Sequence, residues 1–481
     1  MTTTTSLRKI LDRKQFEMIS PTPIASAAGM FVSSTPPNFY RQMALFNSSS
    51  TTPYLYDAQE DAYLQLPSPA LSGMATGSCG CFHPYGPTFT ASAGSTTSVT
   101  STLTIPGDLT GATMRCTAGA GAGQNVVITS NTTGANAVMN FAAVGSAFNN
   151  TSQFQLYTGR FYVLGASGAA WIMKAFDLAT WTWGSALTTT SGPSQTAAAD
   201  QVMLATSSFC TASSSLNPSY FVSSTSSGSN SSTTLNDTTQ TWTASQFVNF
   251  QVRITGGTGA GQVKTISANT STQLTVSAWT TTPDATSTYV IEGADDSIYV
   301  LGNAVVTIFK YSIGGNSWSS PSPTTARAAA PGSGVSGNWI STSPNVANFQ
   351  TPAIANNMNG RRIYSFRGGA TATLDYYDIA ANTWVNGVSY GGGATATFNA
   401  GTSYTEWQGL IYIFDGNSSF YRYDVGGNLM YPLAKLIYQQ GAVIVGAKLW
   451  MHGYYDSGTQ KILWLYLLSS SLSTTFRLML I

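Results

Sequence analysis

Short apolar strands recur along the chain, and each is followed by a turn and a second, alternating strand. An apolar strand joined to an alternating strand by a glycine-containing turn forms a β-hairpin. The clearest first strands are RFYVLG (160–165), SIYVLG (297–302), RIYSFRGG (362–369) and LIYIFDG (410–416). MALFNS (43–48) takes this place in an earlier unit, and KLWMHGYYDSGTQKILWLYLL (448–468) keeps the order strand, turn, strand. The pattern therefore predicts a chain of repeated hairpins.

Large side chains recur at a fixed spacing within these units. Six residues separate a first aromatic residue from a second large one in the pairs Tyr56/Tyr63, Phe176/Trp183, Tyr311/Trp318, Tyr377/Trp384 and Tyr423/Met430. An aspartate follows the first aromatic residue in four units, at Asp57, Asp177, Asp378 and Asp424, and Ser312 replaces it in the third. Asp side chains accept hydrogen bonds from turn amides, and aromatic rings supply apolar area for packing sheets together. We predict that these residues form a structural blade motif.

Repetition on this scale predicts a radial β-architecture, because one such sheet cannot bury both of its faces alone. Several sheets stacked around an axis make a β-propeller. The spacing from Tyr to Trp resembles the kelch repeat, and six units spread this resemblance over much of the chain. It implies a six-bladed, kelch-like propeller with four-stranded blades.

A second, longer duplication interrupts the hairpin repeats. MRCTAGAGAGQ (Met114–Gln124) and VRITGGTGAGQ (Val252–Gln262) match at an offset of 138 residues. The shared positions are Arg115/Arg253, Gly119/Gly257, Gly121/Gly259, Gly123/Gly261 and Gln124/Gln262. Alternation in QVRIT, VKTIS and QLTVS predicts short strands, so the glycine run is the loop of a hairpin. A phosphate-binding loop is disfavoured, because neither Lys-Ser/Thr nor a helical stretch follows the glycines.

These patterns predict an all-β chain with two inserted modules and a short N-terminal arm. The predicted boundaries are an arm at 1–40, blade 1 at 41–85, module 1 at 86–158, blade 2 at 159–220, module 2 at 221–294 and blades 3–6 at 295–481.

The arm contains a charged stretch, SLRKILDRKQFEM (6–18), with apolar residues at helical spacing. The predicted docking residues are Leu7, Ile10, Leu11 and Phe16. A helix this short is unstable alone, so it should pack on something larger. Three alternatives stay open: the propeller's own edge, a neighbouring subunit, and nucleic acid.

The amino-acid composition reduces the range of possible functions. Charged residues make up only 8% of the chain, against about a quarter in ordinary globular proteins. So few charges argue against a cytosolic enzyme that stays soluble alone, and they fit a protein covered by neighbours in an assembly. A net charge of +1 gives no support for specific nucleic-acid binding. Neither a signal peptide nor an apolar run of membrane-spanning length is visible.

Candidate chemistry is sparse. Cys79, Cys81 and His83 lie close together, but the only other histidine, His452, is remote in the sequence, so buried thiols are favoured over a metal site. A copper-radical site of the kelch-type oxidases is a lesser alternative. The carboxylates Asp295, Asp296, Glu406 and Asp415 do not identify a converging catalytic pair. We predict no catalytic residue, no metal and no cofactor.

The module sequence carries a second resemblance. Its GTGAGQ turn, the following SANT (267–270) and PDATSTYVI (283–291) resemble a module that recurs in virion proteins of tailed bacteriophages. The resemblance implies a non-enzymatic structural protein of the virion, in the tail or at the portal vertex. It would be nozzle-like, adaptor-like or fibre-attaching, and present in several symmetric copies. Its partners would be portal, adaptor, tail or fibre proteins and its own copies.

Two other functions are kept as alternatives. One is a receptor- or glycan-binding tail or decoration protein that binds host surface glycan through aromatic residues such as Trp242 and Trp279. The other is a glycan-degrading tail enzyme.

Overall fold

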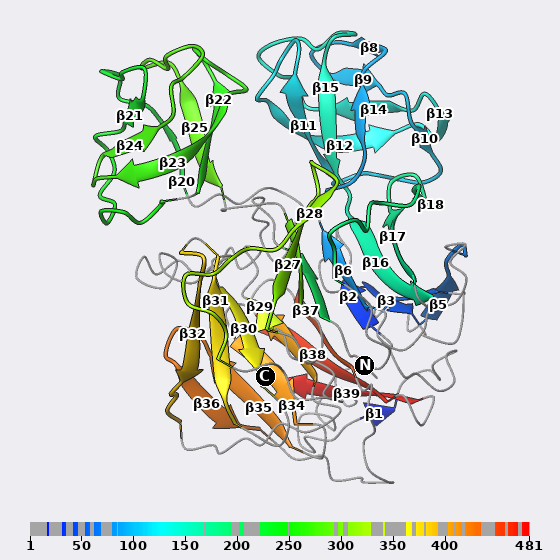
Figure 1. The fold of residues 1–481 in the computed structure, drawn as a ribbon. Helices are drawn as coiled ribbons and strands as arrows, with labels where there is room; N and C mark the ends of the chain where they lie inside the picture. The colour runs from blue at the N-terminus through cyan, green and yellow to red at the C-terminus, as the bar shows by residue number, and fades with distance from the viewer. Residues whose placement is uncertain are drawn as a thin grey trace.

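Six antiparallel, four-stranded sheets form the body of the chain in the residues that the computed structural model describes (Figure 1). Those residues are 17–18, 31–34, 42–46, 53–57, 62–68, 79–83, 85–167, 170–193, 202–205, 222–248, 250–292, 297–301, 306–328, 340–341, 362–367, 372–379, 381–392, 403–407, 410–415, 419–433, 448–456, 460–469 and 474–480. Within these ranges every regular element is a strand, and no helix is long and apolar enough to cross a membrane.

In blades 1 to 5 each sheet is a meander whose first strand is innermost, whereas in blade 6 the innermost strand is β37 (Lys448–Asp456) and the strand that is first in sequence is outermost. Blade 1 comprises β2 (Phe31–Ser34), β3 (Gln42–Phe46), β4 (Tyr54–Asp57) and β5 (Ala62–Gln65). Blade 2 comprises β6 (Cys79–His83), β16 (Arg160–Ser167), β17 (Ala170–Asp177) and β18 (Thr182–Trp183). Blade 3 comprises β19 (Val202–Ala205), β26 (Ser297–Leu301), β27 (Ile308–Ser312) and β28 (Ser317–Ser319).

The C-terminal half repeats this arrangement. Blade 4 comprises β29 (Ile340–Ser341), β30 (Arg362–Phe366), β31 (Leu374–Asp378) and β32 (Thr383–Val388). Blade 5 comprises β33 (Ser403–Trp407), β34 (Leu410–Phe414), β35 (Phe420–Asp424) and β36 (Leu429–Pro432). Blade 6 comprises β37 (Lys448–Asp456), β38 (Gln460–Ser469) and β39 (Thr474–Leu480), with β1 (Glu17–Met18) as its outermost strand.

The blades stack in a ring because each buries its apolar face on the next. Inner strand β6 packs beside both β2 and β19, and β37 packs beside both β33 and β2. Blades 3 and 4 share a buried cluster that includes Tyr299, Ile363 and Trp384. The pairing of Met18 with Phe476 ties the N-terminal strand to the last blade and closes the ring. The predicted all-β, six-bladed propeller is confirmed.

Both modules enter the propeller at the same point of their blades. Module 1 lies between β6 and β16, and module 2 lies between β19 and β26. Each therefore replaces the loop from the innermost to the second strand, in adjacent blades. Loops at equivalent positions of a propeller leave from one face, and Figure 1 shows both modules above that face.

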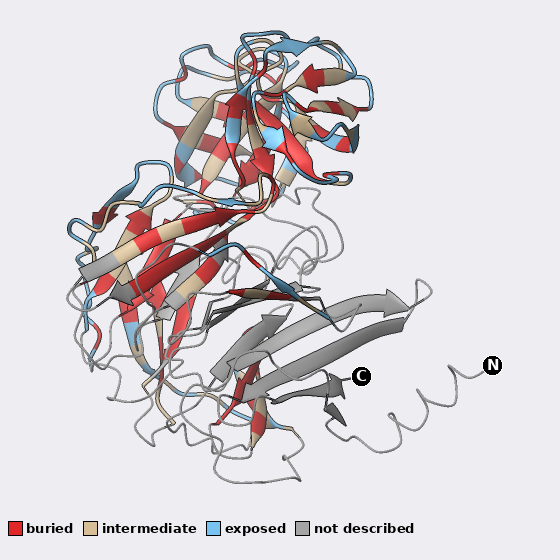
Figure 2. Cartoon of the chain, turned by 90° about the vertical axis from the view of Figure 1, so that its right-hand side faces the viewer, coloured by how far each residue is buried: buried red, intermediate tan, exposed pale blue. Residues whose placement is uncertain are grey.

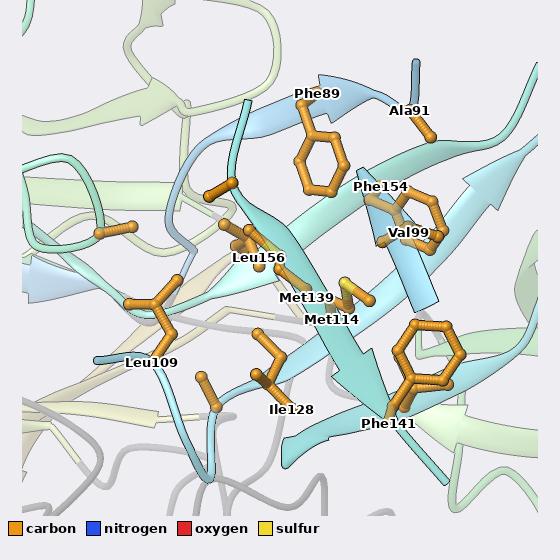
Figure 3. Close-up of a cluster of buried hydrophobic side chains, with 14 of the residues drawn as sticks. Phe89, Ala91, Val99, Leu109, Met114, Ile128, Met139, Phe141, Phe154 and Leu156 are labelled. Carbon is orange, nitrogen blue, oxygen red and sulfur yellow. The ribbon is translucent and has the colours of Figure 1, made fainter. Parts of the chain in front are cut away.

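Module 1 has its own core. Its strands are β7 (Thr88–Thr90), β8 (Ala93–Gly94), β9 (Ser98–Thr100), β10 (Thr104–Ile105), β11 (Thr113–Ala118), β12 (Asn125–Asn131), β13 (Gly134–Ala135), β14 (Val138–Phe141) and β15 (Gln153–Tyr157). They comprise one seven-stranded sheet and a separate pair of strands, β10 and β13. Phe89 stacks on Phe154, and Met114 and Ile128 are fully buried beside them (Figure 3). Figure 2 shows buried residues running through the modules as well as through the blades.

Module 2 repeats this plan. Its strands are β20 (Val222–Thr225), β21 (Thr234–Asn236), β22 (Gln251–Gly256), β23 (Val263–Asn269), β24 (Gln273–Val276) and β25 (Thr288–Glu292). β22 pairs with β25 as β11 pairs with β15 in module 1, so Tyr289 occupies the place of Phe154 and Glu292 the place of Tyr157. The two modules are thus superimposable at the level of strand register.

The blade boundaries differ from those predicted. Phe31–Ser34 pairs with β3 inside blade 1, although the sequence placed it in the arm. Cys79–His83 pairs with β16 inside blade 2, although the sequence placed it in blade 1. Val202–Ala205 pairs with β26 inside blade 3, although the sequence placed it in blade 2. These three inner strands contain no Tyr or Trp, so the repeat could not locate them. Glu17–Met18, at the end of the predicted helical stretch 6–18, forms strand β1 instead, because it pairs with β39. The predicted docking residues Leu7, Ile10, Leu11 and Phe16 lie outside the described residues.

Candidate functional site: the blade latch and the paired inserts

The two large residues of each blade motif are register partners in the outer pair of strands. The register pairs are Tyr56↔Tyr63, Phe176↔Trp183, Tyr311↔Trp318, Tyr377↔Trp384 and Tyr423↔Met430. Ring centroids lie 5.2 Å apart for Tyr311 and Trp318, and 5.5 Å apart for Tyr377 and Trp384. Six intervening residues suffice for a tight hairpin that places the pair on one face of the blade.

The residue after the first aromatic one closes the turn between these strands. The Asp378 carboxylate accepts a hydrogen bond from the Ala381 amide at 2.9 Å, and Asp424 accepts one from the Gly427 amide at 3.0 Å. The Ser312 hydroxyl accepts one from the Gly315 amide at 3.2 Å in blade 3. In blade 2, Asp177 binds the amide of Ala179 and pairs with Arg160 at 2.8 Å.

An asparagine that the sequence analysis overlooked completes the motif. The hydroxyls of Tyr311, Tyr377 and Tyr423 donate to Asn316, Asn382 and Asn428 at 2.8, 2.7 and 2.8 Å. All three asparagines have positive φ, at 43°, 47° and 53°. Asn tolerates this left-handed conformation better than most residues. The signal was visible in the sequence, because Asn stands two positions before the second large residue in GNSW, ANTW and GNLM.

Blade 2 shows why the asparagine depends on the tyrosine. Its first aromatic residue is Phe176, which has no hydroxyl to donate. Trp181 takes the asparagine's place at φ 57°, and its ring packs edge-on against Phe176 with centroids 5.4 Å apart. An apolar contact thus replaces the hydrogen bond.

The same motif holds the connector that arrives from the preceding blade. Asn382 Nδ2 donates to the Ser322 carbonyl at 3.0 Å, and Asn428 Nδ2 donates to the Ser389 carbonyl at 2.8 Å. Trp318 Nε1 donates to the Thr188 carbonyl at 2.8 Å, and Trp183 Nε1 to the Pro67 carbonyl at 2.7 Å. We call the Tyr, Asp or Ser, Asn and Trp of one blade its latch, because together they fasten that blade to its predecessor.

The first two glycines of the module turn serve contacts within each module. A Cβ at Gly119 would clash with the Thr151 carbonyl, and one at Gly257 would clash with the Thr286 carbonyl. A Cβ at Gly121 or Gly259 would clash with the side chain of the following glutamine. The turns therefore need glycine for close approach to their own module.

The glutamine pins a neighbouring loop to this turn. Gln262 Oε1 accepts from the amides of Thr280 and Thr281 at 2.7 and 3.0 Å, while Nε2 donates to the carbonyls of Gly259 and Thr281. Gln124 makes the corresponding contacts with Gly121 and Ser146. This network fills the turn with protein groups.

The third glycine of each turn lies where the two modules touch. A Cβ at Gly123 would lie 3.1 Å from the amide nitrogen of Gly261, and a Cβ at Gly261 would lie 3.1 Å from Cβ of Ala122. Arg115 of module 1 and Glu292 of module 2 form an ion pair at 2.7 Å with 1% of each side chain exposed. Arg253 also pairs with Glu292, at 3.2 Å. The sequence repeat identified both arginines, but Glu292 carried no signal, since its counterpart is Tyr157.

Two further buried carboxylates have lowered pKa values. Burial alone would raise the pKa of Asp237, but hydrogen bonds from Thr239 and Tyr289 lower it to about 2. Burial would likewise raise the pKa of Asp375, but hydrogen bonds from Arg367 outweigh that effect. Both groups stay ionised and tie strands together inside a module and a blade.

The other residues singled out in the sequence lie apart. Cys81 and His83 are buried on β6, and His83 Nδ1 accepts the Tyr85 amide. Among the described residues, no three His, Cys, Asp or Glu side chains form a group that could hold a metal ion. Trp242 and Trp279 are buried in the core of module 2, so neither forms an exposed glycan platform. Asp415 accepts the Ser419 amide. The side chains of Asp57, Asp295, Asp296 and Glu406 lie outside the described residues.

No family model and no curated protein matches the sequence. Among solved structures, the chain is similar to U3-55K with 7% identity and a TM-score of 0.36, covering 97% of this chain and 99% of that one. It is also similar to the designed protein Ika8, with 11% identity, a TM-score of 0.28 and coverage of 95% and 100%. YCF48 bound to a D1 peptide shows 9% identity, a TM-score of 0.25 and coverage of 82% and 95%. These scores are too low to indicate a function.

Proposed function

We propose that this chain is a non-enzymatic structural component of a tailed-bacteriophage virion, in the tail or at the portal vertex. It is present there in several symmetric copies, and its neighbours are portal, adaptor, tail or fibre proteins. The observation that carries the proposal is the pair of duplicated modules, whose sequence resembles a module of virion proteins. Both leave one face of the propeller as separately cored bodies on adjacent blades.

The composition supports this placement. A chain with 8% charged residues has few groups to keep isolated molecules apart in solution. The latch and the module turns use their polar groups for internal hydrogen bonds, which suits a rigid building block. Rigid repeated parts are what a symmetric assembly needs, since each copy must present the same contacts.

Cryo-electron microscopy of the phage particle that encodes this chain tests the proposal. We expect propeller-shaped density in several copies around the tail or portal axis, with the module-bearing face against neighbouring proteins. Density at a distal tip with the modules facing outward would favour the receptor-binding alternative, and a glycan array with the purified chain would check it. The proposal would be overturned if the particles lacked the chain. It would also be overturned if the purified chain degraded host polysaccharide.

A further inference from the structure

The contact between the modules brings together residues at equivalent positions. Gly123 and Gly261 are counterparts in the repeat, and each turn approaches the other. A Cβ at Gly123 would lie 3.1 Å from the Gly261 amide nitrogen and similarly close to the carbonyls of Thr255 and Ile254, and a Cβ at Gly261 would lie 3.1 Å from Cβ of Ala122. Contact between equivalent residues is the mark of an isologous interface, which has a two-fold axis through its centre. The two glycine turns therefore meet in an approximately two-fold arrangement, in which the neighbours of Gly123 and Gly261 are not identical, although both modules belong to one chain.

Four side chains surround this contact in two equivalent pairs. Arg115 and Arg253 are counterparts on β11 and β22, and Tyr157 and Glu292 are counterparts on β15 and β25. Arg115 reaches Glu292 of the other module while its guanidinium lies 5.6 Å from the ring centroid of Tyr157. Arg253 pairs with Glu292 of its own module.

The charges of this set are unbalanced. Two arginines share one buried carboxylate, because module 1 has Tyr157 where module 2 has Glu292. If a second copy of module 2 replaced module 1, Arg253 of that copy would take the place of Arg115. The set would then contain two arginines and two glutamates, and each arginine would have a carboxylate on both sides. Two copies of module 1 would instead bury two arginines without an acid, which is strongly unfavourable.

We propose that module 2 carries a self-complementary face, formed by Arg253, Gly261 and Glu292, that binds a second copy of module 2. Module 1 covers this face within the chain and so acts as an internal cap. Module 1 can cover this face because it has the equivalent arginine, Arg115, and the equivalent glycine turn. It lacks a carboxylate at Tyr157, so it neutralises fewer of the buried charges than a second copy of module 2 would. This inference stands apart from the virion proposal, since it concerns one contact inside the chain.

Deleting the cap tests the inference. His83 and Arg160 are register partners at the ends of β6 and β16, so a two-residue Asn-Gly turn in place of residues 84–159 closes the hairpin of blade 2. We expect each particle of this variant to contain twice as many chains as a particle of the full chain. Light scattering at micromolar concentration measures this number. Adding Glu292→Gln should restore the number found for the full chain.

The matched control deletes module 2. Ala205 and Ile298 are register partners, so an Asn-Gly turn in place of residues 206–297 closes blade 3 in the same way. This variant exposes Arg115 beside Tyr157 and should show no doubling. Doubling in both deletions would overturn the inference, because it would not depend on the carboxylate. Absence of doubling in a cap-deleted variant with intact β circular dichroism would overturn it as well.

A point variant covers the case in which a deletion fails to fold. Arg115→Glu in the full chain places an acid against Glu292 and should release the cap, giving the same doubling. Arg115→Glu with Glu292→Gln should not double. If Arg115→Glu keeps the chain number of the unaltered chain, the cap proposal is wrong. Each comparison is the number of chains per particle divided by that of the full chain, so the test works whatever number of chains the full chain assembles. A negative result would leave the virion proposal unaffected.

Discussion

Asn382 tolerates a positive φ angle and also makes two side-chain hydrogen bonds. Its backbone lies at φ 47°, and its side chain accepts from Tyr377 and donates to the Ser322 carbonyl. Asn382→Gly keeps the φ angle but loses both bonds, so it should destabilise the protein by about 1–3 kcal/mol. Asn382→Ala loses the bonds and strains the backbone, which adds roughly 1 kcal/mol.

Urea unfolding followed by circular dichroism checks this order. Tyr377→Phe is the matched control, because it removes only the hydroxyl and should cost about 1 kcal/mol. Equal midpoints for the Gly and Ala variants would show that the backbone angle does not matter at this turn.

Asp237 makes the stability of module 2 depend on acid. Its pKa is about 2 in the folded chain and 3.8 without the fold, so folding favours the ionised form. The stabilisation is fully present above pH 4 and is lost as pH falls from about 4 towards 2. It should amount to roughly 2 kcal/mol.

Hydrogen exchange between pH 5 and 2, corrected for intrinsic rates, measures this loss in β22. Module 1 is an internal control at β11, because Phe154 stands where module 2 has Tyr289. Asp237→Asn should reduce the pH dependence in module 2 alone, and a smaller slope should remain because hydrogen bonds from Thr286 and Thr258 also lower the pKa of Asp284. A slope that this substitution leaves unchanged would assign the acid sensitivity to another group.

At the scale of elements, the strands that carry a repeated sequence motif could be predicted from the sequence, and the strands without such a motif could not. The outer strands of the blades were visible because Tyr377 and Trp384 recur with fixed spacing. Inner strands such as β6 and β19 carry no such marker, since they are defined only by packing around the axis. Glu292 could not be predicted for a different reason. It differs from its counterpart Tyr157, so the repeat does not mark it, and its partner Arg115 is distant in sequence.

Gln262 gives a prediction for one loop. Its side chain supplies the hydrogen bonds that join the glycine turn to Thr280 and Thr281. Gln262→Ala should leave these amides without a protein acceptor and raise their hydrogen exchange at least tenfold, which corresponds to about 1.4 kcal/mol. Gln262→Glu is the matched control, because it keeps the acceptor oxygen for both amides. Unchanged exchange in the Ala variant would mean that the glycines alone hold the loop.

At the scale of the whole molecule, the ring is closed by two termini that meet in one sheet. Glu17 and Met18 pair with Arg477 and Phe476, so the first and last strands among the described residues share blade 6. A ring closed in this way loses cooperativity when its closing strand is removed, because the last blade then has three strands and no link to the N-terminal segment. Stability and assembly should therefore respond differently to truncation on either side of β1.

Two truncations separate these effects. Removing residues 1–16 keeps β1 and should lower the thermal midpoint less than removing residues 1–18, which should lower it by several degrees. If the arm reaches a neighbouring subunit, the shorter truncation will also reduce the number of chains per particle in light scattering. If the arm packs on its own propeller, the shorter truncation will lower the thermal midpoint without changing that number. Equal midpoints for the two truncations would show that β1 contributes nothing to closing the ring.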